Sequence, residues 1–321
     1  HFLPQMIENL WAARDVAKKN NEKAFSQAIK IIMNSFYGVL GSSGCRFFDT
    51  RLASSITMRG HEIMKQTKVL IEDKGYQVIY GDTDSTFVSL NSSFEQEQAD
   101  EIGHSLVAYI NDWWTNHLKE VYNLTSILEL EYETHYRKFL MPTIRGSETG
   151  SKKRYAGLIN QGDQEEIIFK GLESARTDWT PLAQQFQQTL YEMVFHDQDP
   201  TDYVRQFVNE TAAGEHDDLL VYQKRLRRKL HEYQKNIPPQ VRAARMADEI
   251  NAQLGRPLQY QNKGRIQYVI TQNGPEPKEY LKSGIDYQHY IDKQIKPVAE
   301  AILPFIGLDF ERVSGQQLGL F

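Results

Sequence analysis

The sequence contains one cysteine, no long apolar run and no large net charge, and each of these absences excludes a class of protein. The single Cys45 cannot form a disulfide within the chain or complete a multi-cysteine metal site, which suits a reducing compartment. No stretch approaches the roughly 18 consecutive apolar residues that a membrane-spanning helix needs. The formal net charge of −5 at pH 7 gives no global signal for nucleic acid binding, so any such signal must be local.

The 321 residues suffice for two or three domains, and a hydrophobic content of 40% with 25% charged residues is typical of a globular protein. Apolar residues at helical spacing predict four helices, over about 4–20, 22–37, 52–74 and 94–118, and alternation predicts strands at 127–140, 154–160 and 166–170. From about residue 177 the pattern is mostly helical, with a short extended pair at 255–273. These elements predict an α+β fold with a largely antiparallel sheet.

A turn at residues 80–85, with the sequence YGDTDS, carries two carboxylates, Asp82 and Asp84. β-Branched and aromatic residues flank the turn on both sides, as in a β-hairpin. Side chains alternate along an extended chain, so we expect both carboxylates on one face, where a hard cation such as Mg²⁺ would offset their repulsion. The alternative is a plain β-turn, in which Asp and Gly are common for conformational reasons alone.

The first two predicted helices are joined at Asn20 and Asn21 and should form an antiparallel hairpin. Arg14 and Lys18 lie one turn apart on the first helix, and facing helices would bring them close to Lys30 on the second. Arg and Lys together suit a triphosphate, although solvated cations on an exposed helix are the alternative. The second helix should present a polar face at 27, 30, 34 and 37 and pack an apolar face at 29, 32, 33 and 36.

Two local concentrations of basic residues are candidates for contact with a sugar-phosphate backbone. The segment KKRYAG at 152–157 combines bases with a tyrosine, and the run at 224–229 could follow phosphates with an affinity that falls steeply with salt. A basic surface turn and a charged solvated helix are the respective alternatives. The candidate residues are Lys152, Lys153, Arg154, Tyr155, Lys224, Arg225, Arg227 and Arg228.

The last eight residues form a polar segment that ends in Leu318, Leu320 and Phe321. Three large apolar side chains without an evident core suggest insertion into a hydrophobic pocket of a partner. Docking back onto the chain's own domain is the alternative.

Taken together, these motifs resemble the C-terminal half of a family B DNA polymerase, most closely the bacterial members. The family's fingers motif, Lys-x3-Asn-Ser-x-Tyr-Gly, matches residues 30–38, and its palm motif YGDTDS matches 80–85 without a change. The primer-contacting motif KKxYAG matches 152–157, and KGLE at 170–173 with Arg176 and Asp178 resembles the entry into the thumb. The motifs stand in the family's order over nearly the whole chain.

The resemblance implies a role for each matched residue. Asp84 would be the principal metal ligand with Asp82 beside it, and two Mg²⁺ ions would serve a nucleotidyl transfer that releases pyrophosphate. Arg14, Lys18 and Lys30 would hold the incoming dNTP, with Lys30 placed to neutralise or protonate the pyrophosphate. Asn34 and Tyr37 would line the nascent base-pair pocket, and residues 153–155 would steady the primer. The tail resembles a sliding-clamp peptide, through Gln317, Leu318, Leu320 and Phe321.

The resemblance also implies a domain order and a set of partners. Helical-hairpin fingers would occupy 1–44, an antiparallel-sheet palm 45–171, a mostly helical DNA-binding thumb 172–310 and a clamp-binding tail 311–321. The partners would be primer–template DNA, dNTP, the bacterial sliding clamp and the N-terminal half of the same polymerase, in the cytoplasm at the nucleoid. In the family another palm carboxylate and any 3′→5′ exonuclease lie upstream, so we expect this chain alone to be inactive in replication or repair synthesis.

Two other functions remain open at this point. The first is a non-catalytic module that binds DNA and the clamp. The second, which the fingers motif disfavours by resemblance only, is an RNA-templated or RNA-making polymerase with a similar palm hairpin.

Overall fold

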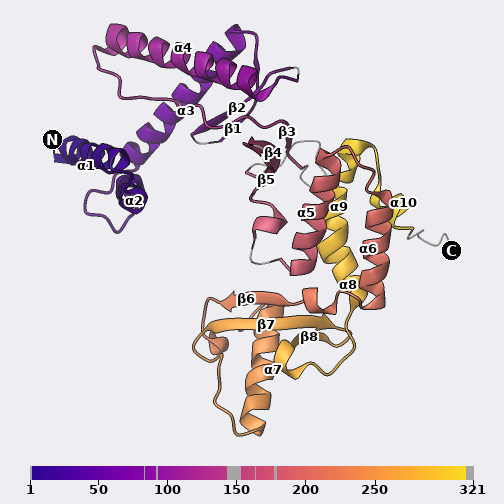
Figure 1. Cartoon of the computed structure of the whole chain (residues 1–321). Helices are drawn as coiled ribbons and strands as arrows, with labels where there is room; N and C mark the ends of the chain where they lie inside the picture. Colours follow the sequence, from indigo (N-terminus) through magenta and orange to yellow (C-terminus); the bar gives the residue numbers. More distant parts are fainter. Residues whose placement is uncertain are drawn as a thin grey trace. The chain divides into compact units, whose positions relative to one another are not determined.

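The computed structural model describes residues 2–82, 84–91, 93–142, 153–162, 164–176 and 179–315. The chain divides into two compact units, His1–Tyr132 and Glu133–Phe321 (Figure 1). Both units combine helices with antiparallel strands, so the predicted mixture of helix and antiparallel sheet is confirmed. Within the described ranges, no helix is both long and apolar enough to cross a membrane.

Over its described residues, the first unit contains four helices and one two-stranded hairpin. Its elements are α1 (Phe2–Lys19), α2 (Lys23–Leu40), α3 (Thr50–Asp73), β1 (Gln77–Asp82), β2 (Ser85–Ser89) and α4 (Gln96–Tyr122). The predicted break between the first two helices is confirmed: Asn21 takes a positive φ of 58°, and the Glu22 amide donates to the Ala17 carbonyl at 2.9 Å. α1 and α2 pack against each other, as the predicted helical hairpin requires.

Helix α3 supports the hairpin that follows it. Its first turn is capped by Asp49, whose carboxylate accepts the Arg51 amide at 2.9 Å, and Gly75 ends it with a φ of +87°. Leu70 and Ile71 of α3 form a small buried cluster with Ile110 and Trp114 of α4. Trp114 is the buried indole of α4, at 4% exposure, and its Nε1 donates to Thr67 Oγ1 at 3.3 Å, whereas Trp113 packs partly buried against the same cluster.

The strand predicted over 127–140 was wrong for most of its length, since only Lys138–Leu140 forms a strand, β3. Residues 128–132 lie along α4 instead, where Leu128 and Leu130 pack on the buried cluster and the Tyr132 hydroxyl donates to Asp100 Oδ1 at 2.6 Å. The Asn111 side chain forms hydrogen bonds with both backbone groups of Leu130: it accepts one from the N–H at 2.9 Å and donates one to the carbonyl at 3.0 Å. The alternation of apolar residues therefore reflects their packing against α4. The Asn111 side chain makes the backbone hydrogen bonds that a neighbouring strand would otherwise make.

The described part of the second unit contains two three-stranded sheets and a helical core. Its strands are β3, β4 (Tyr155–Gln161) and β5 (Gln164–Lys170) in one sheet, and β6 (Tyr222–Leu226), β7 (Gly264–Thr271) and β8 (Gly274–Pro277) in the other. Its helices are α5 (Pro181–Phe195), α6 (Thr201–Ala213), α7 (Pro239–Gln253), α8 (Tyr287–Tyr290), α9 (Lys296–Glu300) and α10 (Phe310–Ser314), with a π-helical turn at Ile291–Ile295. Short 3₁₀ turns lie at Glu173–Ala175, Asp217–Leu219, Leu230–Glu232, Lys278–Tyr280 and Leu303–Ile306.

The core of this unit is large and continuous. Phe186, Tyr191 and Tyr290 are fully buried within it, and Phe310 is 2% exposed.

The expectation that the basic run at 224–229 lies on a helix was wrong, because β6 carries its first three residues. Tyr222 and Leu226 are buried on one face of β6, opposite Tyr268 and Gly264 of β7, so strand periodicity prevails there.

Candidate nucleotidyl-transfer site

The carboxylate turn joins β1 and β2 in the first unit. Asp82 pairs with Ser85 at the end of the ladder, and the Asp84 amide donates to the Asp82 carbonyl at 2.5 Å. Asp84 is exposed and Asp82 is half-buried, whereas Thr83 lies outside the described residues. The predicted hairpin is confirmed, but Asp84 belongs to the turn and not to a strand. Strand alternation therefore does not extend to Asp84, and the expectation that both carboxylates lie on one face stays a prediction.

Packing beneath the turn holds the hairpin in place. The Tyr80 and Phe87 rings lie 5.4 Å apart across the ladder, and Val78 and Val88 pack on the cluster formed with α3 and α4. The register shifts at Ile79, which indicates a bulge of the kind that twists a strand and redirects its end. The exposed carboxylate thus stands on a backbone whose position is set by buried contacts.

The donor chemistry of this turn fits a hard divalent cation. Two carboxylates supply only oxygen ligands, and Mg²⁺ is typically held by one or two carboxylates together with water and substrate oxygens. Among the residues that the structure describes, no group of three or more His, Cys, Asp or Glu side chains is gathered to hold a metal ion. Within the described chain, Asp82 and Asp84 are therefore the candidate ligands.

The three cations predicted on the helical hairpin have different surroundings. Lys30 is exposed on α2, and Lys18 is exposed and lies 4.0 Å from Glu131 Oε1. Arg14 is half-buried, and its Nε atom is buried without a hydrogen-bond partner among the described residues. The structure gives no contact that joins the three, so their gathering around a triphosphate stays a prediction.

The predicted polar face of α2 is exposed. Lys30 and Asn34 lie on it, as does Tyr37, whose hydroxyl lies 2.8 Å from Thr57 Oγ1 of α3. The opposite face packs less than predicted. Ile29 is 3% exposed, but Ile32 is 48% exposed, so the apolar face covers a narrower stripe than its sequence suggests.

The motif at 152–157 lies partly inside the second unit's first sheet. Lys152 is outside the described residues, Lys153 has a positive φ of 63°, and Tyr155 begins β4 with its ring 5.2 Å from that of Phe139. Arg154 forms an ion pair with Glu173, a carboxylate that is 6% exposed. Gln187 Nε2 donates to the other oxygen of Glu173 at 2.8 Å. Sequence reasoning missed this arrangement, because nothing in the spacing of 154 and 173 indicates that they meet.

Steric contacts account for two glycines of these motifs. A Cβ at Gly157 would lie 2.1 Å from Cδ1 of Tyr136, so this position admits no side chain unless the ring moves. Gly171 has a φ of +63°, and a Cβ there would lie 2.2 Å from the Lys153 carbonyl oxygen. Both glycines serve close packing of the chain on itself.

The second basic run is divided between two faces of β6. Arg225 is exposed, whereas Lys224 is half-buried on the face that carries Tyr222 and Leu226. Arg227 and Arg228 are exposed in the loop after the strand. The tail residues Gln317, Leu318, Leu320 and Phe321 lie outside the described residues.

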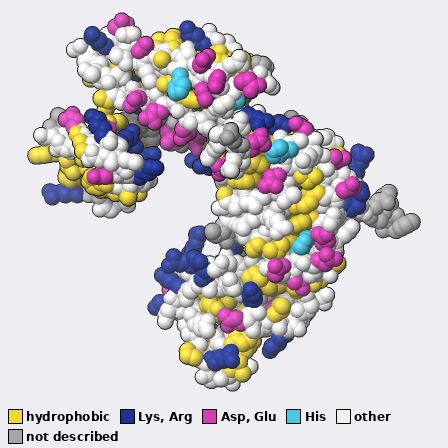
Figure 2. All heavy atoms as spheres, in the orientation of Figure 1, with side chains coloured by type: hydrophobic (Ala, Val, Ile, Leu, Met, Phe, Trp, Pro, Cys, Tyr) yellow, Lys and Arg dark blue, Asp and Glu magenta, His cyan; other side chains and the backbone are white. Residues whose placement is uncertain are grey.

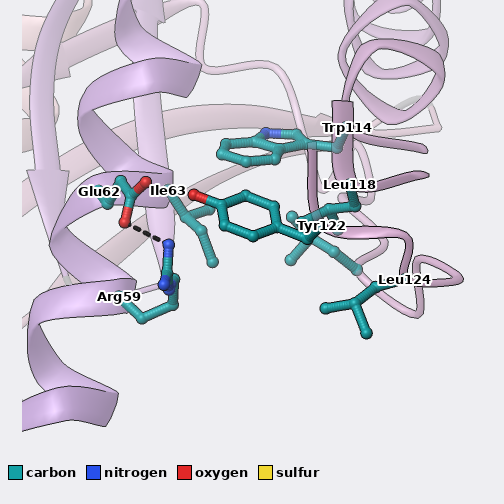
Figure 3. Close-up of a pocket in the computed structure, with 8 residues that line it drawn as sticks. Arg59, Glu62, Ile63, Trp114, Leu118, Tyr122 and Leu124 are labelled. Carbon is teal, nitrogen blue, oxygen red and sulfur yellow. Dashed lines mark hydrogen bonds and ion pairs between the residues drawn. The ribbon is translucent and has the colours of Figure 1, made fainter. Parts of the chain in front are cut away.

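A cavity of about 270 Å³, which the sequence did not predict, opens between α3 and α4 (Figure 3). Arg59 of α3 donates to Glu62 Oε2 at 2.6 Å and lies 5.5 Å from the centre of the Tyr122 ring. The remaining lining is apolar, namely Ile63, Trp114, Leu118, Leu124 and Leu128. The cavity presents no arrangement of nucleophile and base, so it does not alter the choice of site.

Comparisons with known proteins agree with the resemblance seen in the motifs. The family described as DNA polymerase family B matches residues 2–305. The chain is 61% identical to "DNA polymerase II" of Escherichia coli (strain K12) over all 321 residues, which cover 41% of that protein. It is 28% identical to a "DNA polymerase" of Thermococcus gorgonarius over 99% of its own length and 41% of that relative.

A more distant relative is the "DNA polymerase alpha catalytic subunit" of Xenopus laevis. It is 28% identical over 95% of this chain and 21% of its own length. The chain thus spans about two fifths, or less, of the curated relatives that it matches.

Proposed function

Because the chain belongs to DNA polymerase family B, we propose that the protein of which it forms part carries out template-directed DNA synthesis. The observation that carries the proposal is the family match over residues 2–305, together with the intact YGDTDS turn between β1 and β2. The reaction is attack of a primer 3′-hydroxyl on the α-phosphorus of a dNTP. The new P–O bond forms as the bond to pyrophosphate breaks.

Asp84 and Asp82 are the residues that would hold the catalytic Mg²⁺ ions. When bound, such ions lower the pKa of the attacking hydroxyl and neutralise charge on the leaving group. The exposed carboxylate of Asp84 on a rigid hairpin can accept a cation without disturbing the core. Catalysis of this kind depends on positioning and charge, and the buried contacts under the hairpin supply the positioning.

Lys30 and its neighbours on the helical hairpin would bind the nucleotide. Lys30 and Lys18 are both exposed, and Lys30 shares a polar face of α2 with Asn34 and Tyr37, which would line the base-pair pocket. In that place Lys30 would neutralise charge or donate a proton to departing pyrophosphate. Arg14 and Lys18 would contact the same triphosphate.

The further assignments follow the family's order. We assign 1–44 to fingers, 45–171 to palm, 172–310 to thumb and 311–321 to a clamp-binding tail, with Lys152, Lys153, Arg154 and Tyr155 at the primer. The bacterial sliding clamp and an N-terminal half with a further palm carboxylate complete the assembly. By the same reasoning, the isolated chain is inactive and the complete protein active in primer extension. Clear product from the isolated chain with Mg²⁺ and dNTPs would contradict this.

The decisive experiment changes one carboxylate in the complete protein. Asp84→Asn should abolish primer extension and leave DNA affinity nearly unchanged, because an exposed turn residue supports no packing. Asp112→Asn, an exposed carboxylate on α4, is the matched control and should retain full activity. Extension by Asp84→Asn at the control's rate would mean that the site is wrong, and would favour a module that binds DNA and the clamp without catalysis.

The nucleotide and clamp assignments have separate tests. Lys30→Ala should raise the KM for dNTP while DNA affinity stays within about twofold, and Lys23→Ala, exposed on the same helix, should change neither. Equal loss of both properties would indicate a structural role for Lys30. Deletion of residues 318–321 should remove stimulation by the clamp and leave distributive synthesis intact.

A further inference from the structure

The bulge at Ile79 decides which residues of the β1–β2 hairpin face helix α3, which packs against both strands. Val78 pairs with Val88 before the bulge, and Gly81 pairs with Thr86 after it. Directly paired residues share a face of the ladder, and alternation along β2 puts Thr86 on the same face as Val88. Without the extra residue, Gly81 would lie on the opposite face. The bulge therefore turns the backbone of Gly81 toward α3.

The residue of α3 that meets this end of the hairpin is Met64. A Cβ atom at Gly81 would lie 3.3 Å from Met64 Cε, so the tip of the methionine packs on the Gly81 backbone. Across the ladder, the Thr86 hydroxyl donates to Met64 Sδ at 3.9 Å, a weak bond because thioether sulfur is a weak acceptor. Met64 thus contacts both residues of the last pair before Asp82 and Ser85, which close the ladder at the turn.

Helix α3 is itself held in place next to Met64. The adjacent Ile63 packs against the buried cluster that includes Leu70 of the same helix. Less than one turn further along, Thr67 accepts the indole Nε1 of Trp114 at 3.3 Å, which ties α3 to α4. Met64 therefore projects toward the hairpin from a helix whose position is fixed by buried contacts.

The turn needs such a contact because a two-stranded hairpin is at best marginally stable alone. Val78 and Val88 anchor the hairpin on the cluster of α3 and α4, at the end far from the turn. Asp82 and Asp84 lie beyond that anchor. The contact with Met64 is made at the pair next to Asp82, where it can fix the height of the turn above α3.

We propose that Met64 is a positioning residue for the metal site, which sets the distance of the YGDTDS turn from α3 and so the place of the Asp82 and Asp84 carboxylates. The proposal rests on the function proposed above and adds no ligand to the site. A catalytic site requires its groups to be held within about 0.5 Å, and a displacement of about 1 Å can cost about 10²-fold in rate. Methionine suits this place because its flexible thioether fills irregular gaps between packed elements.

The first test measures steady-state primer extension by the complete protein, well below its melting temperature. Met64→Ala removes the tip that contacts Gly81 and should lower kcat about tenfold or more. The KM for dNTP and the DNA affinity should stay within about twofold, because the substrates still bind. Met58→Ala, the matched control, changes a 64% exposed methionine of the same helix and should keep the original kcat. Met64→Leu keeps most of the volume and should stay within about threefold of the original kcat.

A double-mutant cycle tests the contact itself. Gly81→Ala adds a methyl group directed at Met64 Cε, so it should lower kcat in the unsubstituted protein. In Met64→Ala the same methyl group enters the space of the removed side chain, and it should raise kcat above that of Met64→Ala alone. A change by the same factor in both backgrounds would show that the two residues act independently and would overturn the proposal.

Metal binding gives a readout that does not depend on turnover. The probe is Mn²⁺, titrated into the complete protein while the electron paramagnetic resonance signal of the free ion is measured. Figure 2 shows Asp and Glu side chains, in magenta, spread over the visible face of the first unit, so Mn²⁺ will also bind away from the turn. The difference between the unsubstituted protein and Asp84→Asn isolates the binding at the turn. Met64→Ala should weaken that component several-fold, and Met58→Ala should not.

Melting curves separate positioning from a purely structural role. A structural role for Met64 would lower the melting temperature and leave both kcat and Mn²⁺ binding at the turn unchanged, which would overturn the proposal. Equal impairment of Met64→Leu and Met64→Ala would overturn it as well. Met64→Val, which also lacks the tip, takes the place of Met64→Ala if that variant is unfolded at the assay temperature.

The same measurements distinguish this proposal from the proposed function. If the complete protein extends primers and Met64→Ala does so at the rate of Met58→Ala, the positioning role fails and the polymerase assignment stands. If the unsubstituted protein makes no product, the proposed function fails, and the Mn²⁺ titration alone decides whether Met64 positions the turn.

Discussion

Removing the carboxylate of Glu173 should destabilise the second unit substantially. Glu173 is 6% exposed and is held by Arg154 and by Gln187, so Glu173→Gln removes the charge–charge interaction between Glu173 and the Arg154 guanidinium. Breaking a buried ion pair by removal of one partner costs about 3–5 kcal/mol. The Arg154 side chain is 33% exposed and can recover part of its hydration, which reduces our expected cost to about 2–3 kcal/mol.

Calorimetry of the chain provides the measurement. For a unit of this size, spanning Glu133–Phe321, that loss of stability corresponds to a decrease in melting temperature of roughly 5–10 °C. Glu166→Gln changes an exposed glutamate on the neighbouring strand β5 and should stay within about 0.5 kcal/mol of the original. A double-mutant cycle with Arg154→Met should show coupling of more than about 1 kcal/mol.

One result would refute the predicted destabilisation and would change the role assigned to Arg154. If Glu173→Gln melts with the control while Arg154→Met lowers only DNA affinity, the ion pair contributes nothing to stability. Arg154 would then act chiefly on the primer, as its motif suggests, and the inference from burial would be refuted.

Three other perturbations test the fold. Gly157→Ala should cost about 1–3 kcal/mol because its Cβ meets the Tyr136 ring, and Tyr136→Leu in the same chain should recover part of the loss seen by urea denaturation. Phe186→Ala, at a fully buried position, should cost about 3–5 kcal/mol, whereas Phe305→Ala, at a half-exposed one, should cost much less; equal costs would contradict the core assignment. The hydrogen bond between His196 and Glu165 raises the pKa of His196 and lowers that of Glu165. Glu165 therefore contributes fully above its ordinary pKa of 4.5, and less as pH falls through its lowered value. His196 contributes fully below its ordinary pKa of 6.5, and less as pH rises through its raised value, so the pair's stabilisation should be greatest between those limits. In melting curves from pH 4 to 8, His196→Gln should flatten this dependence; an unchanged profile would exclude the pair as its source.

Local signals predicted the first unit well. The break at Asn20 and Asn21 and the end of α3 before Gly75 are encoded within a few residues, so they are legible in the sequence. The capping of α3 by Asp49 is equally local, but it was not predicted. The turn at 80–85 was predicted for the same reason. At 127–132 the prediction failed because Asn111 of α4, 19 residues earlier in the chain, makes the backbone hydrogen bonds of Leu130 that a neighbouring strand would have made, and no local pattern indicates this.

The site was less accessible to sequence reasoning than the fold. The type of residue at 82 and 84 indicated metal chemistry, but the register of the hairpin decided that Asp84 lies in the turn. Likewise, the basic run at 224–229 was evident, whereas the pairing of its first residues in β6 with β7 joins segments that lie far apart in the sequence. Such pairings follow from the whole fold, and one sequence does not specify them locally.

The contact between Gly157 and Tyr136 constrains the order in which this chain can change over generations. Every possible replacement of a glycine introduces a Cβ, and at position 157 that atom would meet the aromatic ring. A mutation there is therefore tolerated more readily in a lineage where position 136 has already become smaller. An ancestor that carried a side chain at 157 should therefore have lacked the large ring at 136. Substitutions at the two positions are expected to be correlated during evolution.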